Sequence, residues 1–162
     1  MFMKQVNKAD KLVVVRVSHK KAGQDNKLFF LFTALQVEEV LQDICVQPLP
    51  FAPSFLEGVT LWRGQVLPIV DIEQRFGFSG SKEAERDLFL VVRTGGKDST
   101  DGAQILRCVL RVPGKFQVVD MPDSISSIKC EQIGLESSMI RGVFQQNEDI
   151  FILPDLVSIL QN

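Results

Sequence analysis

The chain has 162 residues, of which 45% are hydrophobic and 23% are charged, and this balance is typical of a globular protein. No apolar run approaches the ~18 residues that span a bilayer, and the N-terminus lacks the apolar core and cleavage site of a signal peptide. We therefore expect a cytoplasmic protein without direct membrane insertion.

The cysteine and histidine content argues against metal and disulfide chemistry. Cys45, Cys108 and Cys130 are odd in number and widely spaced, and His19 is the single histidine. We expect reduced thiols, with Cys45 and Cys108 as small core residues because both lie in apolar runs. No metal or cofactor is expected.

Charge is uneven along the chain. Residues 1–27 carry seven basic and two acidic side chains, whereas the rest of the chain is acidic enough to bring the net charge to −2. The basic residues are scattered, and no aromatic residues alternate with them to stack on bases. The pattern favours solvated strand and loop surfaces, and we expect no nucleic-acid partner.

The first elements in chain order are strands. Residues 12–17 are rich in β-branched side chains, residues 28–32 are apolar throughout, and the two segments are predicted to pair as a hairpin. Residues 37, 40, 41 and 44 have helical spacing, yet the valine content also allows a bent strand, so both alternatives stay open.

Residues 48–78 contain the most distinctive pattern in the chain. Three prolines in residues 48–53 predict a fixed extended connection, followed by one helical turn that begins at Ser54. Gly58 and Gly64 flank a predicted hairpin tip that carries Trp62, the single tryptophan, and Arg63. A strand up to residue 71 and a short helix closed by a left-handed Gly77 should follow.

The rest of the chain predicts further short strands at residues 88–93, 105–112 and 116–119, and a short helix at 154–160. Residues 79–87 and 123–139 are polar connections. Residues 94–102 are glycine-rich but lack the spacing of a phosphate-binding loop, so a hairpin loop is predicted there. Many short strands and little helix indicate an all-β protein.

An internal repeat links the two ends of this pattern. Residues 56–76 align without a gap to residues 140–160 at a constant offset of 84, which places Asp71 over Asp155. Repeats of this kind share a core that neither copy could bury alone. Residues 62–64 correspond to 146–148, Gln-Asn-Glu, so only the first copy carries the tryptophan and the arginine.

These motifs, in this order, resemble the CheW family of chemotaxis-type adaptors, which is related to the regulatory domain of CheA kinases. The likeness covers nearly the whole chain and rests on Val-x-Glu-Val at residues 37–40, Pro-x-Ala-Pro at 50–53, Gly-Val at 58–59, Arg-Gly at 63–64 and Leu-Pro-Ile-Val-Asp-Ile at 67–72. The resemblance implies two intertwined five-stranded SH3-like β-barrels about a pseudo-twofold axis. We expect a single domain over 1–162, with halves 12–87 and 88–162 sharing a core.

The resemblance also implies a non-enzymatic scaffold between a CheA-type histidine kinase regulatory domain and the cytoplasmic tip of a chemoreceptor, in chemotaxis, phototaxis or pilus motility. The implied partner-binding residues are Val37, Glu39, Val40, Gly58, Val59, Trp62, Arg63 and Gly64. The chain departs from the family pattern at Leu61, Trp62 and Arg111, which leaves the identity of the partners open.

One physical hypothesis concerns the predicted hairpin tip. The guanidinium of Arg63 can pair with the carboxylate of Glu39, which would hold the tip so that Trp62 and Val59 present an apolar surface. The alternative is that Arg63 is a solvated loop residue and that Trp62 closes a barrel end.

Two other functions stay open as alternatives. A small-molecule or nucleotide-binding β-barrel would need a pocket with converging polar groups, which the sequence does not reveal. A hydrolase using Cys45 and His19 lacks a third orienting group. Asp71 and Asp155 follow apolar strands at predicted helix starts, where capping is the simpler role.

Overall fold

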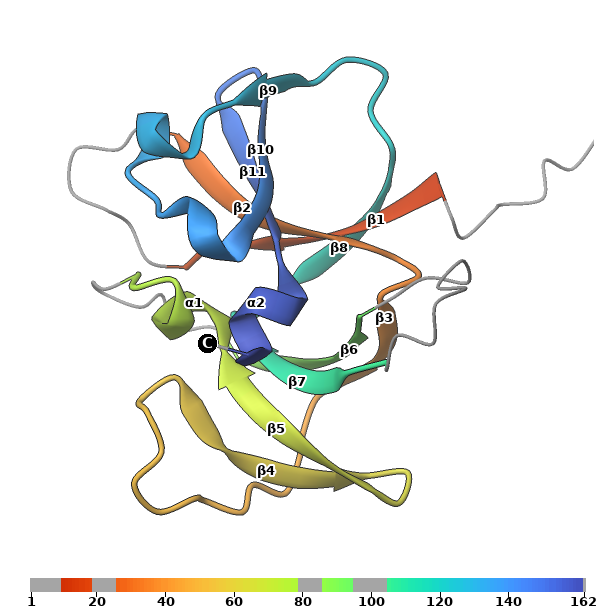
Figure 1. Cartoon of the computed structure of the whole chain (residues 1–162). Coiled ribbons are helices and arrows are strands. Elements are labelled where there is room, and N and C mark those ends of the chain that lie inside the picture. Colours follow the sequence, from red (N-terminus) through yellow and green to blue (C-terminus); the bar gives the residue numbers. More distant parts are fainter. Residues whose placement is uncertain (1–9, 19–25, 79–85, 95–104, 162) are drawn as a thin grey trace, which may run out of the picture.

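The computed structural model describes residues 10–18, 26–78, 86–94 and 105–161 (Figure 1). His19, most of the basic N-terminal residues and large parts of the loops predicted at 79–87 and 94–102 lie outside these ranges. Within them the protein consists almost entirely of short strands, arranged in two sheets that pack against each other.

The two sheets contain six and five strands. Sheet A has the strand order β8 (Phe116–Asp120), β1 (Lys11–Arg16), β2 (Lys27–Thr33), β11 (Asp149–Pro154), β10 (Ile140–Gln146) and β9 (Ser126–Ile128). Sheet B has the order β3 (Val37–Leu41), β6 (Leu88–Arg93), β7 (Arg107–Val112), β5 (Gln65–Asp71) and β4 (Leu56–Trp62). The strands predicted at 12–17, 28–32, 88–93, 105–112 and 116–119 are confirmed, as is the β1–β2 hairpin.

The main core lies between the two sheets, where the facing sides of their strands are buried. Side chains on the facing sides of the sheets form this core, including Phe30, Phe32, Leu90, Leu110, Ile150 and Ile152. Alternate residues point to the opposite face of each sheet, where two smaller clusters form. The sheet A cluster consists of Leu12, Val14 and Leu31, and the sheet B cluster consists of Leu67, Ile69, Val91 and Val109.

Each sheet combines strands from both halves of the chain. In sheet A the N-terminal strand β2 pairs in parallel with the C-terminal strand β11, and in sheet B β5 pairs in parallel with β7. Figure 1 shows the consequence, since the orange strand β2 lies beside the blue strand β11 in the upper sheet. The two halves of the chain are therefore intertwined, as the family resemblance implied.

The 84-residue repeat is confirmed in structural detail. The first and last residues of β4 and β10 differ by the same offset of 84. Both strands show an irregular register near the repeated glycines Gly58 and Gly142. The helices α1 (Ile72–Arg75) and α2 (Leu156–Gln161) follow β5 and β11. Gln74 N donates to Asp71 Oδ1 at 3.1 Å and Val157 N donates to Asp155 Oδ1 at 3.2 Å, so both carboxylates cap helices.

Gly77 closes α1 as predicted and has a φ of 72°. Of the two alternatives left open for residues 37–44, the strand is confirmed: residues 37–41 form β3, which pairs with β6, and a bulge at Glu38 shifts the spacing of the apolar side chains. Several other local expectations are corrected. Ser54 lies in a tight turn in which Leu56 N donates to Pro53 O at 2.9 Å, not in a helical turn.

Cys45, predicted to be a core residue, is exposed, whereas Cys108 is buried. Burial raises the pKa of the Cys108 thiol to about 12. Residues 123–139 are not simply a connection, because they contain β9 and two 3₁₀ turns, Cys130–Ile133 and Ser137–Met139.

The predicted five-stranded barrels are also modified. Strand β9 adds a sixth strand to sheet A, and in the described part of the chain no backbone ladder joins the two outer strands of either sheet. The barrels are therefore open along one side. Whether each opening is filled depends on side chains rather than on backbone pairing.

Candidate protein-binding site

The β4–β5 hairpin ends in a two-residue turn whose geometry follows from the sequence Arg63-Gly64. Both residues have positive φ, 45° for Arg63 and 75° for Gly64, which is the pattern of a type I′ turn. This turn matches the twist of the two strands, but the left-handed conformation is strained for a residue with a side chain. The predicted hairpin tip is thus confirmed, with the arginine side chain at its end.

Gly58 allows another segment of the chain to approach β4 closely. It has a φ of 150°, and a Cβ atom there would lie 2.3 Å from the carbonyl oxygen of Gln47. Gln47 and Val59 exchange two backbone hydrogen bonds of 2.8 and 2.9 Å, which hold the segment after β3 against the hairpin. Gly58 therefore has a structural role at this site.

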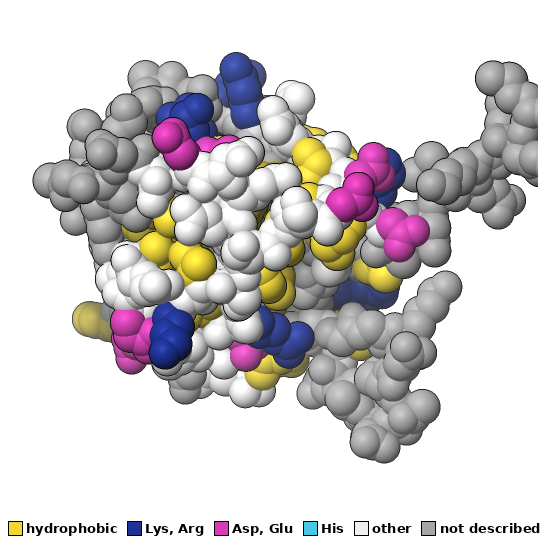
Figure 2. Space-filling model, turned by 90° about the horizontal axis from the view of Figure 1, so that it is seen from above, with side chains coloured by type: hydrophobic (Ala, Val, Ile, Leu, Met, Phe, Trp, Pro, Cys, Tyr) yellow, Lys and Arg dark blue, Asp and Glu magenta, His cyan; other side chains and the backbone are white. Residues whose placement is uncertain are grey.

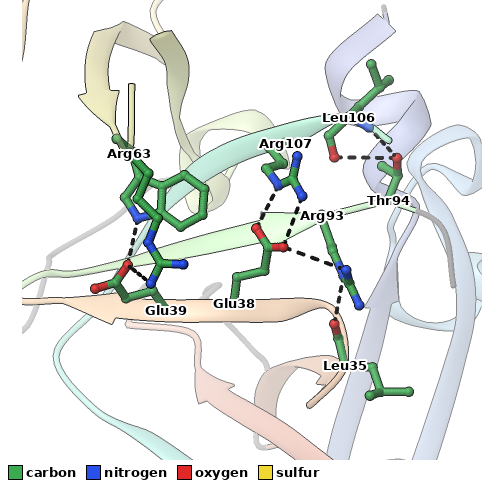
Figure 3. Close-up of polar contacts among 9 residues, drawn as sticks. Leu35, Glu38, Glu39, Arg63, Arg93, Thr94, Leu106 and Arg107 are labelled. Atoms are coloured by element: carbon green, nitrogen blue, oxygen red, sulfur yellow. Dashed lines mark hydrogen bonds and ion pairs between the residues drawn. The ribbon is translucent and has the colours of Figure 1, made fainter. Parts of the chain in front are cut away.

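The carboxylate of Glu39 binds Trp62, the last residue of β4, and Arg63, the first residue of the turn (Figure 3). Its Oε2 accepts a hydrogen bond of 2.6 Å from Trp62 Nε1 and lies 3.4 Å from Arg63 Nη2. The Arg63 guanidinium also lies over the indole ring, with Cζ 4.7 Å from its centroid. We name this group the Glu39 clamp. The predicted Glu39–Arg63 pair is confirmed in geometry, and Trp62 is an additional member that sequence reasoning did not place in it.

The Glu39 clamp joins the two outer strands of sheet B. Glu39 belongs to β3 and Trp62 to β4, which stand at opposite ends of the strand order. The indole is half-buried and packs against the sheet B cluster together with Leu41 and Ile44. Side-chain contacts therefore close the opening that backbone pairing leaves. The exposed ion pair contributes little by itself, whereas the indole N–H bond to a charged carboxylate is stronger.

Strand alternation places Trp62 and Val59 on opposite faces of β4. Trp62 shares the inner face of β4 with the buried Thr60, whereas Val59 and Leu61 point to the other face. Leu61 is 72% exposed and its cross-strand partner Val66 is 66% exposed. The exposed apolar pair of the hairpin is therefore Leu61 and Val66, which sequence reasoning missed.

A groove of about 600 Å³ runs beside this apolar pair. It is lined by Leu41, Asp43, Ile44, Cys45, Gln47, Val59, Thr60, Leu61, Trp62 and Val66. Trp62 lines this groove together with Val59 and Leu61, although it points to the other face of β4. Val37 is buried and Val40 packs against the main core, so these two residues anchor β3 to the core.

Glu38 forms a second polar network beside the clamp. Its carboxylate lies beside the neighbouring strands β6 and β7, where Arg107 Nε donates to it at 2.8 Å and Arg93 Nη1 lies 3.7 Å away (Figure 3). The hydrogen bond from Arg107 is the main reason that the pKa of Glu38 is lowered below its ordinary value of 4.5, and the charges of Arg107, Arg93 and Arg63 add to this. No local signal identified this network, because Arg107 lies far along the chain.

Arg111, a departure from the family pattern, connects β7 to β4 and to the start of β6. Its guanidinium contacts Glu57, and its Nε donates to Asp87 Oδ2 at 2.7 Å. Burial opposes the charged form, but the bonds to the two carboxylates outweigh it and raise the pKa of Arg111. Glu57 is thus part of a structural ion pair.

Across the described ranges, no three His, Cys, Asp or Glu side chains are placed to hold a metal ion together. No helix in the same ranges is long and apolar enough to cross a bilayer.

Comparisons with known proteins give consistent matches. The chain is 25% identical to the chemotaxis protein CheW of Treponema pallidum over 74% of this chain and 68% of that protein. It is also 25% identical to CheW of Klebsiella aerogenes, over 92% of this chain and 89% of that protein. The crystal structure of the scaffolding protein TtCheW from Thermoanaerobacter tengcongensis superposes with a TM-score of 0.65 at 19% identity, covering 95% of this chain and 94% of that one, and shows the same fold.

The family model of the CheW-like domain matches residues 11–162, which include every strand of both sheets. Fold, internal repeat and sequence similarity thus agree, and the chain belongs to the CheW-like domain family.

Proposed function

We propose that this protein is a non-enzymatic cytoplasmic adaptor that couples a chemoreceptor of the methyl-accepting type to a CheA-type histidine kinase. Membership of the CheW-like domain family supports this role, and so do the names of the relatives, which are chemotaxis and scaffolding proteins. The observation that carries the proposal in this chain is the hairpin tip, which the Glu39 clamp holds in one conformation.

The tip has the properties of a binding surface. Arg63 is 68% exposed in its side chain, yet the turn and the Glu39 carboxylate restrict its position, so little conformational entropy would be lost on binding. Leu61 and Val66 add an exposed apolar pair beside it. An arginine next to exposed apolar side chains is a composition typical of binding hot spots. We propose that the kinase regulatory domain or the receptor tip contacts this surface.

The test is binding of the full chain to the regulatory domain of the kinase encoded nearest to it, and separately to a receptor cytoplasmic fragment. Arg63→Ala and Leu61→Ala should each weaken binding to one of the two partners about tenfold, which corresponds to about 1.4 kcal/mol. Asn147→Ala is the matched control, because Asn147 occupies the repeated turn position and has a φ of 54°.

The outcomes separate the parts of the proposal. Loss of binding in the Arg63 and Leu61 variants but not in Asn147→Ala supports both the adaptor role and the tip as its contact. Binding that all variants retain would move the contact away from the tip. Failure of the wild-type chain to bind either partner would overturn the coupling function, while membership of the family would remain.

A further inference from the structure

Sheet A carries an open pocket on the face that points away from the main core. The pocket has a volume of about 350 Å³, within the range of small-molecule sites, and the sheet A cluster lies at its base. Phe29 and Phe151, stacked with ring centroids 5.3 Å apart, and Phe144 also line it. Figure 2 looks onto this end of the molecule and shows hydrophobic side chains uncovered between polar ones.

The internal repeat shows which residues of sheet A correspond to the Glu39 clamp of sheet B. Ile69 of β5 pairs with Val109, and its repeat counterpart in β11 is Leu153. The parallel register of β11 and β2, extended by one residue, sets Leu153 beside Leu31. Val109 and Leu31 are therefore equivalent positions.

From these positions the two sheets can be followed outward. In sheet B the next residues across the ladder are Val91 and then Glu39. In sheet A they are Val14 and then Gln117. Gln117 of β8 is therefore the counterpart of Glu39.

The same comparison identifies the counterpart of the indole. Trp62 corresponds to Gln146 at the repeat offset, and both residues end the first strand of their hairpin. Gln146 and Gln117 both line the sheet A pocket, and they form no side-chain hydrogen bond with each other or with another residue in the described ranges. The space that an indole occupies in sheet B is thus left open in sheet A.

The equivalence of the two sites indicates what kind of group fits the pocket. A flat aromatic ring packs on the same type of aliphatic base in sheet B, where its N–H group is bound by the residue equivalent to Gln117. A glutamine side-chain oxygen can accept such a bond as a carboxylate does. Even an apolar cavity of about 150 Å³ can hold a benzene ring, so the sheet A pocket has sufficient room.

A carboxylate at the rim of the pocket, that of Asp149, indicates which charge a ligand should carry. Asp149 lines the pocket, is half-buried, and has no ion-pair partner among the described residues, although Lys27 is its neighbour in the ladder. The other carboxylate of the lining, Asp120, is paired with Lys11. A partly desolvated carboxylate without a partner favours a cationic ligand group.

We propose that the sheet A pocket binds a small aromatic amine with a ring of about indole size. The ring occupies the place that Trp62 fills in sheet B, and the ammonium group pairs with Asp149. This site is distinct from the hairpin tip, so the proposal stands or falls independently of the adaptor function.

The test is isothermal titration calorimetry of the full chain with tryptamine, which combines an indole ring with an ammonium group. For a ligand of this size we expect a Kd between about 10 µM and 1 mM. Indole alone should bind at least fivefold more weakly. In parallel, the methyl resonances of Leu12, Val14 and Leu31 should shift on titration, which places the ligand in the pocket.

Two variants and two matched controls complete the test. Asp149→Asn should weaken tryptamine binding at least fivefold and leave indole binding unchanged, and Gln146→Trp should abolish both by filling the pocket. Glu148→Gln and Glu148→Trp make the same changes outside the pocket lining and should have no effect. No binding to the wild-type chain at millimolar tryptamine, or binding that survives both pocket variants, overturns the proposal. Should Gln146→Trp fail to fold, Asp149→Asn and the methyl shifts decide.

Discussion

The two sheets of this protein share a strand pattern but differ at their openings. In sheet B the outer strands are joined by Glu39, Trp62 and Arg63, whereas in sheet A the counterparts Gln117 and Gln146 leave a pocket between them. A backbone repeat can therefore be retained while side chains give its copies different tasks. One copy presents a rigid tip, and the other keeps an open cavity.

The largest expected difference between the copies concerns their repeated glycines. Gly58→Ala should lower the free energy of unfolding by about 3 kcal/mol or more, because its Cβ would collide with backbone atoms of Gln47 at a φ of 150°. Gly142→Ala should cost about 1 kcal/mol, because its new Cβ would meet only the ring of Phe144, at 3.0 Å. Urea unfolding measures both, and equal losses would contradict this distinction.

Removal of the indole should have a smaller but still unequal effect. Trp62→Ala uncovers the sheet B cluster and removes the bond to Glu39, so we expect a loss of about 2 kcal/mol in unfolding free energy. Gln146→Ala, the matched change in sheet A, should cost less than about 0.5 kcal/mol. The same urea series tests the pair. A cost of Gln146→Ala as large as that of Trp62→Ala would show that the sheet A opening is not empty of stabilising contacts.

A third prediction introduces the glutamate and the tryptophan of the Glu39 clamp at the equivalent positions of sheet A. The double variant Gln117→Glu with Gln146→Trp should raise the unfolding free energy by about 1 kcal/mol, since the indole would bury the apolar base and the carboxylate would accept its N–H bond. A double-mutant cycle separates the coupling between the two new residues from their individual effects. Coupling energy near zero would mean that the two positions do not face each other as the registers indicate.

Acid should weaken the network beside the Glu39 clamp. The folded state holds the pKa of Glu38 below 4.5, so this residue stabilises the protein above that pH and its contribution is lost as the pH falls toward the lowered value. Glu38→Gln should therefore cost about 1 kcal/mol at pH 7 and less at pH 3.5. Unfolding free energies at the two pH values test this, with Glu136→Gln, an exposed carboxylate, as the control. A cost of Glu38→Gln that does not depend on pH would rule out the carboxylate as its source.

Much of the fold could be predicted from local patterns. The capping residues Asp71 and Asp155 and the Arg63-Gly64 turn depend on residues close in sequence, and both predictions are confirmed. The repeat at an offset of 84 is visible when the chain is aligned with itself, and it is confirmed as well. The Glu39–Arg63 contact was also predicted, because a guanidinium at the tip can pair with a carboxylate and both residues lie in the motifs of the family resemblance.

The remaining features depend on non-local pairing. The bulge at Glu38 exists only in the context of β6, and it turns a helix-like spacing into a strand. The direction of Trp62 depends on which face of β4 points to the sheet B cluster, and this is set by β5 and β7. Strand β9 has three residues with little apolar character, and only its pairing with β10 identifies it.

The parallel ladder between β2 and β11 has a consequence for how the chain folds. Phe29 pairs with Phe151, about 120 residues further along the chain, so sheet A is a structure of high contact order. During synthesis the β1–β2 hairpin leaves the ribosome long before β11 exists, and its two apolar faces remain uncovered until then. Completion of sheet A should therefore be the slow step of folding, and a chain that stops before residue 149 should aggregate through this hairpin.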